Sequence, residues 1–448
     1  MEIKNKKISI IGAVRSGLGA AKLAKQLGAV PFVSDSGTEE KLKSSIEYLK
    51  NENIQFEISN HSEKVFDCYL MVVSPGVPSD AEIIKTARAK NIKIISELEF
   101  GSVFCKANLI AITGTNGKTT TTALCDYLFN VCGVKSYKAG NIGSAFSGIA
   151  LEAKSNEFIS LEVSSFQLDL IDTFKPKVAM ILNITPDHLN RYEHSIDKYA
   201  ESKLRIFENQ DADDYLILNA DSELLNHYFK KAKSRVLYFS TTKKVSNGCF
   251  LENDLIKYVR DDNEEFSCKV SDVFIQGEHN IQNAMAVIMA AKIFHLDNKK
   301  ILKALKSFKG VEHRLELVRE IDGVKFINDS KATNIDSVIV ALKSFNDPIL
   351  LILGGLDKGN DYSMIENLVT DKVKKIYAIG ASADKVFNYF HKKVKTEIKK
   401  DLSEVVNAAI SEARSGDIVL LSPACASFDM FDSYEHRGKV FKEIVNSK

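Results

Sequence analysis

The 448-residue chain has no tryptophan, only 7 prolines and 7 cysteines, and a net charge of +1. Because the charges balance, no basic face is indicated, and we expect no nucleic-acid partner. No apolar stretch approaches the roughly 18 residues of a membrane-spanning helix, so we expect no membrane partner. The first apolar run is short and is broken by Arg15, and we expect no signal peptide.

The few cysteines are odd in number and never spaced as C-x-x-C. This pattern is typical of reduced, mostly buried thiols and predicts a cytoplasmic protein. The composition is ordinary for a globular protein, with 45% hydrophobic and 27% charged residues. At about 150 residues per domain, the length predicts about three domains. The cysteines stand at Cys68, Cys105, Cys125, Cys132, Cys249, Cys268 and Cys425.

The most informative stretch is Thr-Gly-Thr-Asn-Gly-Lys-Thr-Thr at residues 113–120, between an apolar strand-like run and a helix-like run. Its glycines let backbone N–H groups turn toward an anion. The Lys118 ammonium can reach β- and γ-phosphate oxygens, and the Thr119 hydroxyl can bind Mg²⁺. Ile112 stands where the general P-loop pattern has another glycine. The strand and helix context nevertheless favours a phosphate site over an ordinary glycine-rich turn.

Strand and helix patterns alternate in every third of the chain, which predicts an α/β fold with mostly parallel sheets. We divide the chain at residues 1–100, 101–310 and 311–448. The predicted parts are a Rossmann-like N-terminal domain, a central P-loop ATPase domain with a mostly parallel sheet, and a Rossmann-like C-terminal domain.

The first third predicts strand, helix and strand in turn at residues 7–12, 17–28 and 30–35. The glycine-rich turn at residues 12–17 reads Gly-Ala-Val-Arg-Ser-Gly, which is not G-x-G-x-x-G. A βαβ unit that binds another nucleotide, or none, is therefore favoured over a nicotinamide site. A further strand at residues 70–73 runs into a turn, where open α/β sheets collect ligands.

In the later thirds, residues 245–275 are polar and β-like, and we expect hairpins there. Residues 280–305 are periodic and helical, with Ile281, Ala284, Val287 and Ile288 on one face. The other expected strands are at residues 158–161, 178–182, 215–218, 324–327, 349–353, 375–379 and 417–421.

Polar residues follow two of the middle strands. Glu162 could hold the Mg²⁺ of a nucleotide, or it could be a solvated or helix-start acid. His188, in Thr185-Pro186-Asp187-His188, could be a metal ligand, could orient a phosphate, or could be structural. Lys203 lies on a predicted helix, and its residue type alone does not single it out among the many lysines.

Asn280 and Asn283 share one face of a helix start. Capping explains one of them, and the second makes a binding role plausible. Three loops of the last third each follow a predicted strand directly, at residues 328–334, 354–359 and 422–429. The carboxyl ends of parallel strands share one edge of a sheet, so these loops predict a site for an anionic small molecule.

With these motifs, the chain resembles the Mur ligases of bacterial cell-wall synthesis over its whole length. The stretch at residues 113–120 is shared across that superfamily. Those at residues 328–334 and 422–429 resemble the branch that adds D-glutamate. The resemblance implies a monomeric, ATP-dependent ligase of peptidoglycan synthesis. Its substrates would be UDP-N-acetylmuramoyl-L-alanine, D-glutamate and ATP, joined through an acyl phosphate.

Carried over by position, the resemblance implies two Mg²⁺ ions and a catalytic role for Lys118. Thr119 and Glu162 would hold the first ion, and His188 and Lys203 would serve the second. Lys203 would be carbamylated, which turns a cation into a carboxylate-like ligand and requires an uncharged amine. The nucleotide's phosphates would lie against Gly114, Thr115, Asn116, Gly117, Lys118, Thr119 and Thr120.

The resemblance also assigns binding residues outside the phosphate turn. Asn283, Arg314 and Asp329 resemble the adenine, phosphate and ribose contacts. Asn141 and His188 approach the muramoyl part, and Ser164 joins the substrate-binding set. The uridine-nucleotide pocket would comprise Arg15, Ser16, Asp35, Ser36 and Gly76. The D-glutamate site would comprise Lys331, Thr333, Lys358, Ser427 and Tyr434.

Two alternatives stay open at this point. A sibling ligase would add another amino acid with the same chemistry. A nucleotide-binding regulator would keep the phosphate turn without catalysis, although the intact Lys118, Glu162, Lys203 and Lys331 argue against it.

Overall fold

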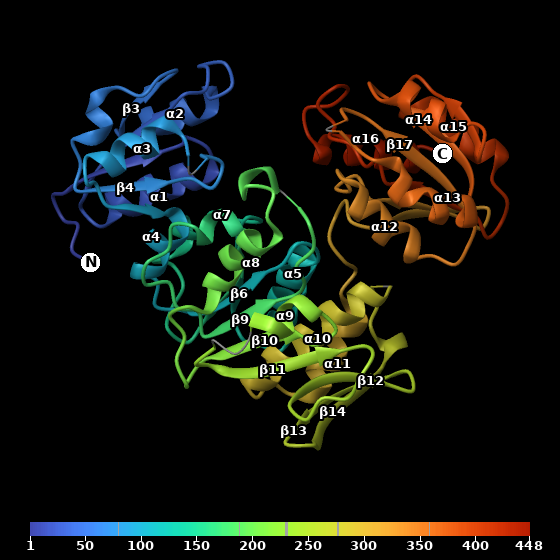
Figure 1. The fold of residues 1–448 in the computed structure, drawn as a ribbon, viewed down its shortest axis with the longest axis horizontal. Helices are drawn as coiled ribbons and strands as arrows, with labels where there is room; N and C mark the ends of the chain where they lie inside the picture. Colours follow the sequence, from blue (N-terminus) through green and yellow to red (C-terminus); the bar gives the residue numbers. More distant parts are fainter. Residues whose placement is uncertain (79, 188, 229–231, 276, 358) are drawn as a thin grey trace. The chain divides into compact units, whose positions relative to one another are not determined.

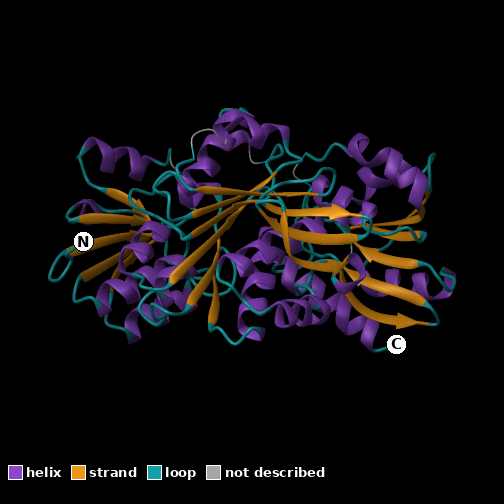
Figure 2. Cartoon of the chain, turned by 90° about the horizontal axis from the view of Figure 1, so that it is seen from below, coloured by secondary structure: helices purple, strands orange, loops and turns teal. Residues whose placement is uncertain are grey.

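The computed structural model of the chain describes residues 1–78, 80–187, 189–228, 232–275, 277–357 and 359–448. The chain forms three sheets but divides into two compact units. Unit 1 comprises Met1–Val273 and Gln282–Ser307, and unit 2 comprises Phe274–Ile281 and Phe308–Lys448. Figure 1 traces the chain through the three sheets, and Figure 2 shows helices on both sides of their strands. No helix within the described ranges combines the length and apolarity of a membrane span.

The first sheet, in unit 1, has the order β3-β2-β1-β4-β5, with every pair parallel. Because β1 has β2 on one side and β4 on the other, the strand order reverses at the carboxyl ends of β1 and β4. The strands are β1 (Lys7–Ile11), β2 (Val30–Asp35), β3 (Gln55–Ile58), β4 (Leu70–Val73) and β5 (Ile94–Ser96). The helices are α1 (Arg15–Gln26), α2 (Lys43–Asn51), η1 (Glu63–Phe66), α3 (Glu82–Ala89) and α4 (Glu97–Phe104).

The second sheet, also in unit 1, has the order β14-β13-β12-β11-β10-β9-β6-β8-β7. All pairs of neighbouring strands from β12 across to β7 are parallel, and β13 is antiparallel to both of its neighbours, β12 and β14. The strands are β6 (Asn108–Thr113), β7 (Ser136–Gly140), β8 (Phe158–Glu162), β9 (Val178–Ile181), β10 (Tyr215–Asn219), β11 (Arg235–Ser240), β12 (Gly248–Glu252), β13 (Leu255–Arg260) and β14 (Asn263–Lys269).

Helices of the middle part flank this sheet, and short 3₁₀ turns join several of them. They are α5 (Lys118–Val131), α6 (Phe146–Ile149), α7 (Ser165–Leu168), η2 (Leu189–Arg191), α8 (Ile196–Leu204), η3 (Arg205–Phe207), α9 (Glu223–Tyr228), η5 (Val270–Asp272), α10 (Glu278–Ile293) and α11 (Asn298–Ser307).

The hairpins expected between residues 245 and 275 are confirmed as the β12-β13-β14 meander. Two-residue turns join its strands. Both central residues of each turn, Asn253–Asp254 and Asp261–Asp262, have positive φ. Such turns match the right-handed twist of paired strands, and Asn and Asp tolerate that conformation best after glycine.

The prediction of one helix with a single apolar face over residues 280–305 is wrong in two respects. The chain breaks into α10 and α11, with His295 in the left-handed region and Asp297 Oδ1 accepting from the Lys300 amide. Moreover, every residue from Ala284 to Ala291 is 0% exposed, so α10 is buried on all sides. A helix that is apolar all round has no single core face for the sequence period to reveal.

The third sheet, in unit 2, has the order β15-β16-β20-β17-β18-β19 and is parallel except for β15. Leu351 and Leu353 of β17 pack against one helical layer, and Leu350 and Ile352 pack against the other, as expected of a strand buried on both faces. The strands are β15 (Glu316–Ile321), β16 (Val324–Asn328), β17 (Ile349–Gly354), β18 (Val373–Ile379), β19 (Lys395–Ile398) and β20 (Ile418–Leu421). The helices are α12 (Ile335–Lys343), η6 (Tyr362–Ile365), α13 (Glu366–Lys372), α14 (Ala383–Phe390), α15 (Leu402–Glu412) and α16 (Tyr434–Asn446).

The α/β fold with three sheets is as the sequence predicted. The seven cysteines are free, five of them buried, which also agrees with the expectation of mostly buried thiols.

Candidate active site

The turn that the sequence predicts to bind phosphate follows β6, which pairs with β8 on one side and β9 on the other. It therefore lies where the strand order reverses, the place where open α/β sheets bind ligands. Gly114 and Gly117 have φ values of 152° and 86°, a region that favours glycine. A Cβ on Gly117 would lie 2.5 Å from Oδ1 of Asn283. The turn thus needs glycine both for its backbone and for the close approach of Asn283.

Asn183, which the sequence did not single out, braces this turn from the neighbouring strand end. Its Oδ1 accepts from the amides of Thr115 (3.1 Å) and Asn116 (2.8 Å), and its Nδ2 donates to the Asn116 carbonyl (3.1 Å). The Thr115 hydroxyl donates to the carbonyl of Thr185 (3.0 Å). An asparagine directly after a strand beside a phosphate turn is the pattern that could have identified it.

Two lysines share one acceptor beneath the turn. Lys118 Nζ donates to the carbonyls of Gly114 (2.7 Å) and Thr115 (2.8 Å), and Lys203 Nζ donates to Gly114 (2.9 Å). Lys203 is 1% exposed, and its ammonium lies 4.6 Å from the centre of the Tyr199 ring. Burial, reinforced by Lys118, lowers the pKa of Lys203 well below its usual value, despite nearby carboxylates such as Asp187. Lys203 therefore has an environment that favours an uncharged amine.

Glu162 ends β8 next to the turn and is 2% exposed. Its Oε1 accepts from Asn141 Nδ2 (3.1 Å). Its buried Oε2 has no hydrogen-bond partner in the described part of the chain. A buried carboxylate oxygen without a donor is costly unless a cation or water meets it. The chemistry of this oxygen fits a Mg²⁺ ion, which prefers oxygen ligands such as carboxylates. The hydroxyl of Thr119, which is 3% exposed, is a second oxygen of suitable type.

The sequence also predicts His188 and Ser164 for this site. His188 falls outside the described residues. Ser164 caps α7: its amide and its hydroxyl both donate to Gln167 Oε1, at 2.9 and 3.0 Å. The structure thus gives Ser164 a helix-capping contact.

The uridine-pocket residues predicted for the first sheet follow β1, β2 and β4, at or next to the point where its strand order reverses. Asp35 fixes the two turns there, because its Oδ2 accepts from the Ala13 amide (2.6 Å) and its Oδ1 from the Gly37 amide (2.7 Å). Ser36 and Gly76 are exposed, and Ser16 is half-buried at the start of α1. The two strand ends are close together, since a Cβ on Gly12 would lie 2.7 Å from Ser74 Oγ.

Arg15 starts α1 but turns its guanidinium toward the loop after β7. Nη1 donates to the carbonyl of Gly143 (3.0 Å), and Nη2 donates to those of Gly140 (3.2 Å) and Asn141 (2.9 Å). The side chain therefore joins the first sheet to the loop that carries Asn141.

In unit 2 the three polar loops predicted to share an edge do so, because β16, β20 and β17 are adjacent and parallel. Hydrogen bonds connect the loops directly. The Ser422 hydroxyl donates to Asp329 Oδ2 (2.9 Å), and Leu356 pairs with Ala426 through two backbone bonds. Strand order, which one sequence does not reveal, makes the three loops a single surface.

Asp329 is buried between these loops, with its Oδ1 accepting from the Leu315 amide (3.3 Å). Burial raises the pKa of this carboxyl to about 7, although Ser422 and the charge of Arg314 pull it downward. Arg314 Nε is buried and has no hydrogen-bond partner among the residues that the structure describes. Arg314 thus contains a buried donor that no described residue satisfies, whereas both oxygens of Asp329 have a donor within the protein.

Arg437 is the residue of this edge that sequence reasoning missed. It is 1% exposed on α16, and its guanidinium donates to the Ser330 hydroxyl and carbonyl (2.9 and 2.8 Å) and to the Cys425 carbonyl (3.1 Å from Nη1 and Nη2). Burial lowers its pKa to about 10. It joins the loops after β16 and β20, and no local pattern distinguishes it from an exposed helical arginine.

The residues predicted to bind D-glutamate lie on these loops and at the start of α16. Lys331 Nζ lies 5.4 Å from the centre of the Tyr434 ring, and the Tyr434 carbonyl accepts from the Ser330 hydroxyl (2.9 Å). Thr333 is half-buried, Ser427 is 2% exposed, and Lys358 falls outside the described residues.

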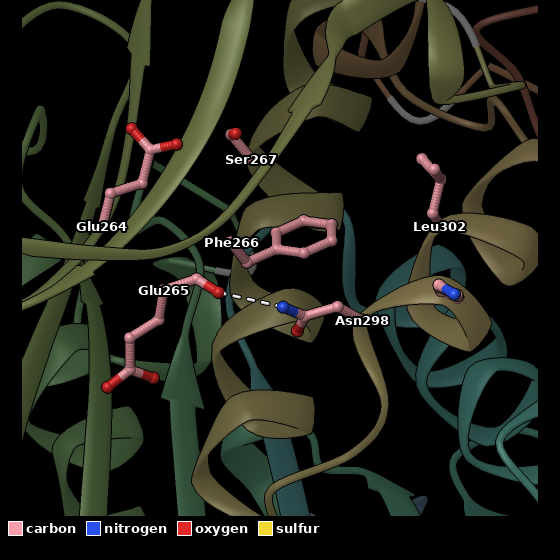
Figure 3. Close-up of a pocket in the computed structure, with 7 residues that line it drawn as sticks. Glu264, Glu265, Phe266, Ser267, Asn298 and Leu302 are labelled. Atoms are coloured by element: carbon pink, nitrogen blue, oxygen red, sulfur yellow. Dashed lines mark hydrogen bonds between the residues drawn. The ribbon is translucent and has the colours of Figure 1, made fainter.

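Two other features lie away from these edges. A cavity of about 360 Å³ between β14 and the start of α11 is lined by seven residues, none of them from the phosphate turn (Figure 3). In unit 2, Glu312, His313 and Glu316 could offer metal-ligand atoms. Lys442 Nζ already donates to both carboxylates (2.7 and 2.5 Å), so their charge is neutralised within the protein.

Comparison with known families covers most of the chain. Residues 7–83 match the MurD N-terminal domain, residues 112–291 the Mur ligase middle domain, and residues 313–425 the glutamate ligase domain of Mur ligases.

Similar curated proteins extend over the whole chain. The UDP-N-acetylmuramoylalanine–D-glutamate ligase of Koribacter versatilis is 42% identical, covering 99% of this chain and 98% of the relative. The protein of the same name from Christiangramia forsetii is 43% identical and covers 99% of this chain and 99% of the relative. That from Clostridioides difficile is 42% identical and covers 100% of each.

Solved structures share the fold at low identity. The UDP-N-acetylmuramate–alanine ligase of Thermotoga maritima has a TM-score of 0.63 at 20% identity, covering 99% of each chain. A pseudomurein peptide ligase of Methanothermus fervidus has a TM-score of 0.61 at 19% identity, covering 99% of this chain and 100% of that one.

Proposed function

The chain belongs to the Mur ligase family, among its UDP-N-acetylmuramoylalanine–D-glutamate ligases, and we propose that it joins these two substrates with ATP as the energy source. The substrate carboxylate takes the γ-phosphoryl group of ATP, giving an acyl phosphate and ADP. The amine of D-glutamate then attacks the acyl carbon, and phosphate leaves. Phosphoryl transfer depends mainly on positioning and charge neutralisation, which suits a braced turn with a lysine.

We assign the phosphates of ATP to the turn from Gly114 to Thr120. Its glycine backbone, the bracing by Asn183 and the dipole of α5 support this assignment. Lys118 would exchange its two carbonyl acceptors for phosphate oxygens. Asn283, beside Gly117, and Arg314 and Asp329 of unit 2 are proposed as adenine, phosphate and ribose contacts.

We propose two Mg²⁺ sites. The unpartnered Glu162 Oε2 and the Thr119 hydroxyl would hold one ion, and His188 and Lys203 would serve the other. Carbamylation of Lys203 is supported by its lowered pKa, because the reaction needs a neutral amine. When bound, the ions neutralise charge on the transferring phosphoryl group.

The remaining assignments place the two other substrates. We propose that the turns at the carboxyl ends of β1, β2 and β4 bind the uridine nucleotide, through Ser16, Asp35, Ser36 and Gly76. Arg15, which the resemblance also places in this pocket, donates with its side chain to residues 140–143. Asn141, Ser164 and His188 would face the muramoyl part. The loop edge of unit 2 would bind D-glutamate, through Lys331, Thr333, Lys358, Ser427 and Tyr434.

We further propose that the enzyme is cytoplasmic, with its seven free thiols reduced, and that it works as a monomer. Light scattering of the purified protein tests the oligomeric state.

The observation that carries the proposed function is identity above 40% over essentially the whole length of ligases with one stated activity. The test is phosphate release from ATP in the presence of Mg²⁺. We expect it only when UDP-N-acetylmuramoylalanine and D-glutamate are both present, with formation of the extended UDP-peptide.

Replacing D-glutamate by L-glutamate, L-alanine or diaminopimelate distinguishes a sibling ligase. Binding of ATP without turnover under any of these conditions would instead favour a nucleotide-binding regulator.

A further inference from the structure

We propose that Arg15 is a positioning residue of the metal site. Its guanidinium fixes the loop at residues 140–143, so that Asn141 of that loop orients the Glu162 carboxylate. This inference rests on the proposed function, in which Glu162 holds Mg²⁺. It assigns the Arg15 side chain to the loop rather than to the uridine nucleotide.

The first link is the contact between Arg15 and the loop. Three loop carbonyls, those of Gly140, Asn141 and Gly143, converge on Nη1 and Nη2 at 2.9–3.2 Å. A guanidinium is planar, always charged and rich in donors, so it can hold several carbonyls in one arrangement. Hydrogen bonds from a charged donor are also stronger than neutral ones. The Arg15 guanidinium therefore holds the main chain of this loop in one arrangement.

The second link is the contact between the loop and the end of β8. Asn141 holds Glu162 twice: its amide donates to the Glu162 carbonyl (3.0 Å), and its Nδ2 donates to Oε1 (3.1 Å). A Cβ on Gly140 would lie 2.3 Å from the Glu162 carbonyl oxygen. The loop and the strand end are thus in direct contact, and movement of one displaces the other.

The third link is the state of the Glu162 carboxylate. Oε1 is held by Asn141, whereas Oε2 is buried and without a hydrogen-bond partner among the described residues. A cation that binds Glu162 would meet Oε2, in a direction set by the bond to Oε1. Mutation of a group that holds a metal ligand in place commonly lowers the affinity for the metal about 10- to 100-fold.

The chain offers a matched control on the same helix. Lys22 of α1 also reaches the middle part of unit 1, where its Nζ pairs with Glu152 Oε1 (3.3 Å), but it does not touch residues 140–143. Lys22→Met therefore removes a cation of α1 and a contact between the two sheets without affecting the proposed link.

The first experiment needs no substrate or metal. Amide hydrogen exchange is compared between wild type, Arg15→Met, Arg15→Lys and Lys22→Met. The amides of Gly140 and Asn141 donate to Ser144 and Glu162 carbonyls, so they are protected while the loop is held. We expect their exchange to accelerate about tenfold in Arg15→Met, the equivalent of one lost charge-assisted hydrogen bond, and less in Arg15→Lys. Unchanged exchange in a folded Arg15→Met protein would overturn the proposal.

The second experiment separates a metal role from a nucleotide role. The rate of ligation is measured while the concentration of Mg²⁺ is varied, and again while that of UDP-N-acetylmuramoylalanine is varied. We expect Arg15→Met to raise the half-saturating Mg²⁺ concentration about tenfold and to raise the KM of the sugar nucleotide by much less, through Asn141 alone. A rise in that KM alone would show that Arg15 contacts the nucleotide and would overturn the proposal.

A double-mutant cycle tests whether the effect runs through Asn141. If Arg15 acts through that residue, Arg15→Met adds little to the Mg²⁺ requirement of Asn141→Ala. Fully additive effects would contradict the link. Absence of ligation by the wild type would refute the proposed function instead, while the exchange comparison would still decide whether Arg15 holds the loop.

Discussion

At the scale of single residues, the proposed active site combines a carbonyl shared by two lysines with a buried carboxylate oxygen. Lys118 and Lys203 share the Gly114 carbonyl, and Glu162 Oε2 is buried without a described partner. In a core built for stability alone, such arrangements are costly, since buried polar groups normally find partners. They are expected where a nucleotide and its metal ions complete the coordination.

The first residue-scale prediction concerns Lys118. Lys118→Ala removes the cation that we place against the γ-phosphate, so turnover should fall about 10²–10³-fold, as when one transition-state donor is lost. Phosphate release with all three substrates measures it. Lys106→Ala, at an exposed position just before β6, is the control and should be neutral. Near-normal turnover in Lys118→Ala would contradict the assignment.

The second residue-scale prediction concerns Asp329. Burial raises the pKa of its carboxyl to about 7. Between about pH 4, the usual carboxyl pKa, and about pH 7, the folded chain keeps a proton that the unfolded chain has lost. Stability should therefore fall as the pH rises through this window and then level off. Asp329→Asn cannot ionise, so its stability relative to wild type should increase over the same window. Thermal unfolding of both proteins at several pH values measures the difference, and a flat difference would refute the shift.

At the scale of elements, tertiary contacts override local preference at several points. In helix α5, four consecutive buried threonines follow the first residue, Lys118, although β-branched residues are poor helix formers. Packing against β7 and β8 and the glycine at its start compensate. Helix α10 differs, because it is buried on all sides. The spacing of its apolar residues therefore does not show which side faces the core.

Helix α16 gives an element-scale prediction, because its Arg437 holds the loops after β16 and β20 together. Arg437→Lys keeps the charge but cannot reach the Ser330 and Cys425 acceptors at once. We expect the KM for D-glutamate to rise about tenfold or more, with the KM for ATP much less affected.

Steady-state kinetics with each substrate varied in turn measures this change. Lys439→Ala, on an exposed part of the same helix, is the control. An unchanged KM for D-glutamate in a folded Arg437→Lys protein would show that the two loops keep their places without the clamp.

At the scale of the whole molecule, three sheets form two compact units. The first two sheets belong together because α1 and α4 approach α6 closely. A Cβ on Gly19 or Gly101 would lie 2.8 Å from Ala145 Cβ or a Phe146 ring carbon, respectively. The buried Glu97 accepts from the Ser147 amide and hydroxyl, at 2.7 and 2.6 Å. These long-range contacts bring the proposed uridine pocket and the phosphate turn into one unit.

Arg191 provides the prediction at this scale. Its guanidinium lies 3.8 Å from the centre of the Phe166 ring, and its Nη2 donates to the Val77 carbonyl (3.2 Å) in the turn after β4. Arg191→Gln should loosen that turn and raise the KM of the sugar nucleotide about three- to tenfold, in the range of one cation–π contact. The KM for D-glutamate should stay unchanged.

The matched control is Arg235→Gln. This arginine makes the same kind of contacts, 5.5 Å from the centre of the Tyr215 ring and 2.9 Å from the Ala212 carbonyl, at the opposite ends of the strands. Equal effects of Arg191→Gln and Arg235→Gln would mean that the change reports general stability.

By itself, the sequence determined the α/β class, the phosphate turn with its flanking strand and helix, most strand positions, and the hairpins near residue 255. These features depend on short-range spacing, glycine conformation and apolar runs, which are local properties. The sequence also predicted that the three polar loops of unit 2 share one edge. Only the tertiary structure decided the strand order that makes these loops neighbours, that Asn183 braces the phosphate turn, that Arg437 joins the loops after β16 and β20, and that Arg15 reaches residues 140–143. Those contacts join residues far apart in the chain, and their formation depends on strand order and packing, which no local pattern encodes.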